Sequence, residues 1–190
     1  MRNLVLGVSA AADYFELMGI ERRLALEEGA LQKRFYELSR QWHPDRFVRK
    51  SEAEREQALE MSSRLNDAYR TLRDPILRAM YLLEIEGFEI GEQRSKDVPP
   101  ELLEEVFELN LALEELRGGD DSARPQLENA RKSFDAMLAQ TGSRLEELFR
   151  AWDASREQVK LAAIRGVLNR RKYILNLLRE VEKELAGEPA

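Results

Sequence analysis

The chain has 190 residues, of which 43% are hydrophobic and 35% charged, and its net charge at pH 7 is −6. This composition is typical of a folded helical protein, and it argues against a dedicated nucleic-acid binder, which normally carries a basic stripe and a high pI. The sequence contains no cysteine and one histidine, which excludes disulfides, zinc fingers and thiolate-bound iron–sulfur clusters. We therefore expect a protein without a metal or other cofactor.

The first residues only faintly resemble a targeting signal. Arg2 precedes a short apolar run over residues 4–8, which is shorter than the apolar core of a signal peptide. We interpret residues 1–12 as a disordered or loosely packed leader. No apolar run elsewhere approaches the ~20 residues that span a bilayer, so we expect a cytoplasmic protein that contacts no membrane.

Helical periodicity dominates the rest of the chain, and no segment has the pattern of a strand. Asp13 and Glu16 have the spacing of a helix N-cap and its third residue, and Gly19 would end this short helix. A second helix must end near His43, because Pro44 disfavours α geometry in the residue before it. The apolar stripe of the second helix consists of Leu31, Phe35, Leu38 and Trp42.

Two further helices follow in this half of the chain. Ser51 and Glu54 form a capping box that begins the third helix. Asp74 and Pro75 end it and begin a fourth helix, which reaches about Gly87. The apolar stripe of the third helix consists of Ala58, Met61, Leu65, Ala68 and Leu72. The stripes of the second and third helices would face each other, which predicts an antiparallel helical hairpin.

The second half of the chain predicts a three-helix bundle. Residues 87–98 contain two glycines among polar residues and precede two prolines, which indicates a linker. Longer helices over 99–117, 122–151 and 156–186 are joined by short loops, as in an antiparallel bundle, and 187–190 form a tail. The core stripe expected in the last helix consists of Ala163, Val167, Ile174, Leu178, Val181 and Leu185. A side stripe of Leu161, Leu168 and Leu175 is interpreted as further packing within the bundle. The fold class is therefore all-α.

The loop of the predicted hairpin contains His43-Pro44-Asp45. A histidine is usually an ordinary surface or core residue. A match to a three-residue motif alone is weak evidence of function, because such short motifs also occur by chance. Its setting is more specific, because residues 31–50 contain six basic and two acidic side chains. A basic helix face beside a charged turn would attract an acidic surface of a partner protein. The alternative is that this face is merely solvated.

Residues 13–83 resemble a J-domain, and we place the domain at 13–86. The positions that carry the resemblance are Tyr14-Phe15, the basic second helix, His43-Pro44-Asp45, Asn66-Asp67-Ala68-Tyr69-Arg70-Thr71-Leu72, and Asp74-Pro75 with Arg78 and Tyr81. The resemblance implies that the protein stimulates ATP hydrolysis by a DnaK-class chaperone. The chaperone-binding residues that it implies are His43, Pro44, Asp45, Lys33, Arg34 and Arg40.

The whole chain is similar to the HscB-type co-chaperone of iron–sulfur cluster assembly, which has a J-domain, a short linker and a three-helix bundle that binds the cluster scaffold protein. The matching stretches are Leu82–Phe88, Leu102–Glu105 and Trp152–Ala154. The glycine-rich segment and the zinc repeats of general J-proteins do not occur in the sequence. The resemblance implies two partners, an HscA- or DnaK-class chaperone and an IscU-type scaffold protein.

The first helix of the predicted bundle is apolar on two faces. The stripe expected to face the core consists of Leu102, Val106, Leu109, Leu113 and Leu116, whereas Leu103, Phe107 and Leu111 line a second face. A second apolar face must be buried or must bind a partner. It would either pack against the J-domain or bind the scaffold, and the resemblance favours the scaffold. The implied scaffold-binding residues are Leu103, Phe107, Glu108, Leu111 and Tyr173, although the family has a polar residue where Leu111 stands.

Other functions have less support in the sequence. The acidic residues fall on solvated helix faces, and there is no second histidine, no cysteine nucleophile and no glycine-rich phosphate loop, so we expect no enzymatic activity. The main alternative is a J-domain co-chaperone or helical adaptor that delivers a different client protein, unrelated to iron–sulfur clusters.

Overall fold

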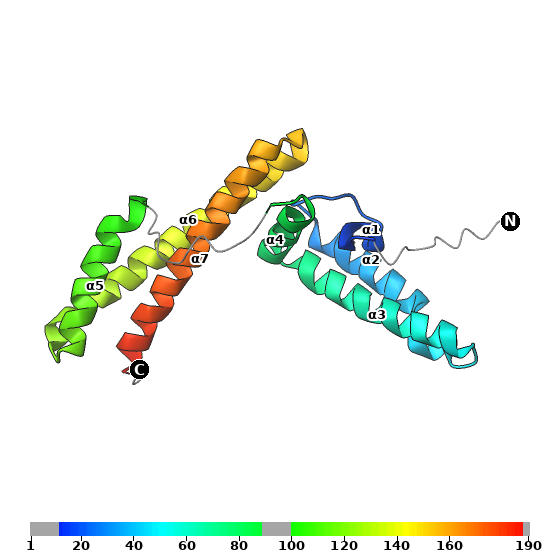
Figure 1. Ribbon diagram of the computed structural model, residues 1–190, viewed down its shortest axis with the longest axis horizontal. Helices are drawn as coiled ribbons and strands as arrows, with labels where there is room; N and C mark the ends of the chain where they lie inside the picture. The colour runs from blue at the N-terminus through cyan, green and yellow to red at the C-terminus, as the bar shows by residue number, and fades with distance from the viewer. Residues whose placement is uncertain (1–11, 89–99, 188–190) are drawn as a thin grey trace. The chain divides into compact units, whose positions relative to one another are not determined.

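All regular elements of the described residues are helices (Figure 1). The computed structural model describes residues 12–88 and 100–187, so almost all of the predicted leader, linker and tail lies outside the described residues. The chain divides into two compact units, residues 1–89 and residues 90–190. The prediction of an all-α fold is confirmed.

The first unit begins with the short helix α1 (Tyr14–Met18). The Asp13 carboxylate accepts hydrogen bonds from the backbone N–H groups of Phe15 (2.8 Å) and Glu16 (2.9 Å). Gly19 ends the helix with a φ of +63°, in the left-handed region that glycine adopts without strain. Both ends of α1 therefore agree with the sequence prediction.

Helices α2 (Glu28–Gln41) and α3 (Glu52–Arg73) form the predicted antiparallel hairpin. The rings of Phe35 and Tyr69 stack between them, with centroids 4.3 Å apart. The Ser51 capping box begins α3, with the Ser51 N–H donating to the Glu54 carboxylate at 2.9 Å. The buried residues of α3 are the five predicted ones, Ala58, Met61, Leu65, Ala68 and Leu72.

Helix α4 (Pro75–Ile85) follows α3 after a single residue, Asp74, whose carboxylate caps the new helix. The buried guanidinium of Arg78 donates to the carbonyl oxygen of Leu24 at 2.9 Å and to that of Leu72. Leu24 lies in the segment between α1 and α2 and is itself buried. Arg78 therefore ties this segment to the end of α3.

The second unit contains α5 (Leu103–Arg117), α6 (Arg124–Ser155) and α7 (Gln158–Ala186), with short 3₁₀ turns at Pro100–Leu102 and Asp121–Ala123. The two long helices are antiparallel, and α5 lies along only one end of the pair (Figure 1). The core there includes Leu109 and Leu113 of α5, Leu127 and Phe134 of α6, and Ile174, Leu178 and Val181 of α7. The Arg117 Nε donates to the Glu184 carboxylate at 2.8 Å, which joins α5 to α7.

The prediction of the core stripe is wrong in the N-terminal half of α7. Ala163 is exposed and Val167 is half-buried, whereas Leu161 and Leu168, expected only as a side stripe, are buried together with Ile164. Farther along the helix, Ile174, Leu178 and Val181 are buried as predicted, whereas Leu185 is half-buried and Leu177, which the prediction left out, is buried. Apolar residues occupy several faces of this part of the helix, and the larger Leu and Ile side chains gain more than alanine does from removal from water, so they take the buried face.

Candidate functional sites

The tripeptide lies at the tip of the α2–α3 hairpin, where residues 44–47 form a 3₁₀ turn. His43 precedes the turn in an extended conformation, and its Nδ1 accepts a hydrogen bond from the Asp45 N–H at 3.3 Å. The Arg46 N–H donates to the His43 carbonyl at 3.0 Å. The side chains of His43 and Asp45 are 58% and 86% exposed, so the turn presents an imidazole and a carboxylate to solvent.

Two aromatic residues on either side of the tripeptide stack on each other. The rings of Trp42 and Phe47 flank the tripeptide in sequence and stack in parallel, with centroids 5.9 Å apart and 2° between their planes. The Arg46 guanidinium donates to the carbonyl of Arg40 at 3.1 Å, which joins the turn to the last residues of α2. The prediction placed Trp42 in the core stripe but missed this role and that of Phe47. Their positions directly beside the tripeptide are the signal that could have indicated it.

The basic side chains predicted to bind the chaperone differ in their surroundings. Lys33 and Arg40 are exposed. Arg34 is half-buried, because its Nε donates to the Met18 carbonyl at 2.8 Å and joins α2 to α1. Tyr36 lies between Lys33 and Arg40 on the helix, at a spacing of three and four residues, and it is also exposed. The basic face of α2 therefore includes an exposed aromatic ring that the sequence analysis did not single out.

The second apolar face of α5 is exposed within the bundle. The exposed fractions of Leu103, Phe107 and Leu111 are 55%, 65% and 47%. The opposite stripe of the same helix is buried at Leu109 and Leu113. We call these three exposed residues the α5 apolar patch. One face of α5 is buried in the bundle, and another exposes three large apolar side chains. An exposed apolar patch of this kind is typical of protein-binding surfaces.

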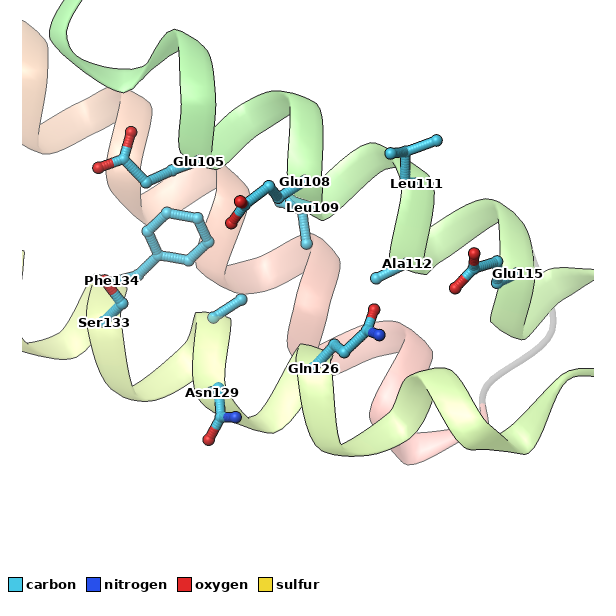
Figure 2. Close-up of a pocket in the computed structure, with 11 residues that line it drawn as sticks. Glu105, Glu108, Leu109, Leu111, Ala112, Glu115, Gln126, Asn129, Ser133 and Phe134 are labelled. Carbon is cyan, nitrogen blue, oxygen red and sulfur yellow. The ribbon is translucent and has the colours of Figure 1, made fainter.

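A groove between α5 and α6, with a volume of about 590 Å³, borders the α5 apolar patch at Leu111. In Figure 2 the ring of Phe134 lies between the two helices. The polar lining consists of Glu105, Glu108 and Glu115 from α5 and Gln126, Asn129 and Ser133 from α6, and no basic residue is among the described residues of the lining. Glu108, one of the implied scaffold-binding residues, therefore lines this groove. The contribution of α6 was not predicted, because no local pattern marks it.

Tyr173, one of the implied scaffold-binding residues, lies on α7. Its ring is half-buried and packs against the core shared by α5, α6 and α7. Burial raises the pKa of its hydroxyl above the ordinary value, and the nearby Glu180 carboxylate adds to the effect. Tyr173 therefore contributes to the packing of the bundle, whatever surface it also offers to a partner.

Two features of the described residues concern metal binding and membrane insertion. Among the described residues, no group of His, Asp and Glu side chains is placed to hold a metal ion. None of the described helices combines the length and the apolar character that crossing a membrane requires.

Comparisons with known proteins cover both units. The model of the DnaJ domain matches residues 13–81, and the model described as the HSCB C-terminal oligomerisation domain matches residues 98–182. The chaperone HscB from Vibrio cholerae is 31% identical over 90% of this chain and 96% of its own, with a TM-score of 0.59. The human co-chaperone protein HscB is 27% identical over 95% of this chain and 85% of its own, with a TM-score of 0.62.

Proposed function

Because the chain belongs to the HscB family of J-domain co-chaperones, we propose that it stimulates the ATPase of an HscA- or DnaK-class chaperone and delivers an IscU-type iron–sulfur cluster scaffold protein to it. In this proposal the first unit binds the chaperone and the second unit binds the scaffold. The protein acts in the cytoplasm and has no catalytic activity of its own. Hydrolysis of ATP in the absence of the chaperone would contradict the last point.

The chaperone-binding residues in this proposal are His43, Pro44 and Asp45 with the basic face of α2. Support comes from the exposure of His43 and Asp45 at the hairpin tip and from the exposed cations of Lys33 and Arg40. An exposed basic surface increases the rate of encounter with an acidic partner surface. Arg34 belongs to the same face, but its bond to the Met18 carbonyl means that its replacement also affects the J-domain itself.

The chaperone part is tested with Asp45→Asn, which retains the size of the side chain and removes its charge. We expect loss of ATPase stimulation with little change in helicity or melting temperature, because an exposed loop-tip side chain contributes little to the core. The matched control is Asp67→Asn on α3, whose exposed carboxylate pairs with Arg70 at 2.9 Å. Full stimulation by the Asp45 variant would contradict the proposed use of the turn.

The observation that carries the scaffold part is the exposure of the α5 apolar patch. Large apolar residues at the centre of a protein interface commonly dominate its binding energy, at about 2 kcal/mol or more each. Phe107 is the middle residue of the patch and the most exposed of the three. Leu103 and Phe107 are one helical turn apart, so together they offer a continuous apolar surface.

The deciding experiment replaces Leu103 and Phe107 together by alanine and titrates the full chain against the purified scaffold by calorimetry, paired with thermal unfolding. We expect the affinity to fall by more than tenfold, while the melting temperature changes little because the buried stripe of α5 is intact. Val159→Ala is the control, since Val159 is an exposed apolar residue at the start of α7. Unchanged affinity with a lower melting temperature would instead assign the α5 apolar patch to packing.

A further inference from the structure

The two nitrogens of the His43 ring have different surroundings. Nδ1 accepts the hydrogen bond from the Asp45 N–H at 3.3 Å, whereas no hydrogen bond among the described residues involves Nε2. A ring nitrogen that accepts a hydrogen bond carries no proton, so the neutral imidazole must carry its proton on Nε2. The 58% exposure of the side chain leaves that N–H accessible to a partner.

Pro44 explains why the ring bonds to Asp45. Proline at the first position of the turn has no N–H, so the first amide that needs an acceptor is that of Asp45. The side chain before a helical turn is the usual source of this acceptor, and here it is the imidazole of His43. The Nδ1–Oδ2 distance to the Asp45 carboxylate is 3.5 Å, longer than the 3.3 Å that separates Nδ1 from the Asp45 amide nitrogen. The backbone amide of Asp45 therefore sets the tautomer, and its carboxylate remains exposed.

We propose that the two ring nitrogens have separate tasks. Nδ1 holds the turn and fixes the tautomer, and the Nε2–H donates to a hydrogen-bond acceptor, a carbonyl or carboxylate oxygen, on the chaperone. This inference rests on the proposed function for its second half, because the acceptor belongs to the chaperone. Its first half concerns the isolated protein alone. His43 is thus both a positioning residue for the turn and a contact residue for the partner.

Two substitutions separate the tasks. In His43→Asn the side-chain oxygen can take the place of Nδ1, and asparagine is a preferred residue before a helical turn, but no donor remains at the position of Nε2. In His43→Gln the longer side chain carries an amide donor near the position of Nε2, but no acceptor at the position of Nδ1. The two variants are therefore complementary.

The first measurement is nuclear magnetic resonance of the uniformly ¹⁵N-labelled full chain at about pH 8.5. His43 is the only histidine, so its ring signals are unambiguous. We expect a protonated Nε2 and an unprotonated Nδ1. We also expect the Asp45 amide to keep the low temperature dependence of a hydrogen-bonded N–H in the Asn variant and to lose it in the Gln variant. A predominant Nδ1–H tautomer, or an unaltered Asp45 amide in the Gln variant, would overturn the first half.

The second measurement is stimulation of the chaperone ATPase. We expect stimulation by the Asn variant to fall at least tenfold although its turn is intact. We expect the Gln variant to lose stimulation as well, because its turn is not held. Full stimulation by the Asn variant would overturn the second half, since it shows that the Nε2–H is not used. If the wild-type chain itself stimulates no chaperone of this class, the proposed function fails and the second half fails with it. The first half is still decided by the tautomer.

Discussion

The hydroxyl of Tyr81, in α4, accepts a hydrogen bond of 2.9 Å from the backbone N–H of Tyr14, the first residue of α1. The two rings stack with centroids 4.5 Å apart. The first amides of a helix have no partner within the helix, and here Tyr81 satisfies one of them while Asp13 satisfies the next two. A residue of α4 thus caps α1. This contact joins the first and the last helix of the J-domain.

Replacement of Tyr81 by phenylalanine tests this cap. The ring and its stacking are retained while the Tyr14 amide loses its acceptor, so we expect a loss of about 1 kcal/mol in the stability of the J-domain. Hydrogen exchange at the Tyr14 amide should accelerate most. Tyr36→Phe is the matched control, because the Tyr36 ring is exposed. Equal exchange at Tyr14 in the two variants would show that the hydroxyl contributes nothing.

Tyr81 should also make the stability of the J-domain depend on pH in the alkaline range. Burial raises the pKa of Tyr81 above its ordinary value, although the hydrogen bond from Tyr14 opposes the effect. The folded state therefore holds this proton more tightly than the unfolded state does. Its contribution to stability is complete below the ordinary tyrosine pKa of about 10 and is lost as the pH rises above it. Urea unfolding measures this effect. Between about pH 8 and about pH 10.5, the wild type should lose more free energy of unfolding than Tyr81→Phe does.

The buried guanidinium of Arg78 predicts a larger effect on stability. In Arg78→Met the hydrogen bonds to the carbonyls of Leu24 and Leu72 are lost from a buried position, and we expect the J-domain to lose about 2–3 kcal/mol of stability. Arg70→Met is the control, because the Arg70 ion pair with Asp67 is exposed and should contribute less than about 1 kcal/mol. Similar unfolding curves for the two variants would contradict a structural role for Arg78.

Charge reversal on the basic face of α2 predicts an effect that depends on salt. Lys33→Glu and Arg40→Glu should weaken binding to the chaperone by about tenfold at low ionic strength, and the difference should shrink as added salt screens exposed charges. The measurement is titration of the chaperone at several salt concentrations. Lys132→Glu, an exposed reversal on α6, is the control with the same change in net charge. A loss of binding that is independent of salt would indicate damage to the fold instead.

The helix ends and the exposed turn could be predicted from the sequence because their interactions are local. Asp13 caps residues two and three positions away, Ser51 bonds to Glu54, and Pro44 acts on the residue directly before it. Such contacts form within one turn of the chain and need no partner from elsewhere. The same holds for the second face of α5, since helical geometry alone separates Phe107 from Leu109.

Only the tertiary structure decided the features that join distant residues. Arg34 bonds to a carbonyl of α1, Tyr173 packs against the core of the bundle, and α6 supplies one wall of the groove beside Glu108. The buried face of α7 around Ile164 could not be chosen from periodicity, because apolar residues occupy several faces of that segment. Which of them is buried depends on the helices packed against it, and the free energy of burial is gained only when those helices meet.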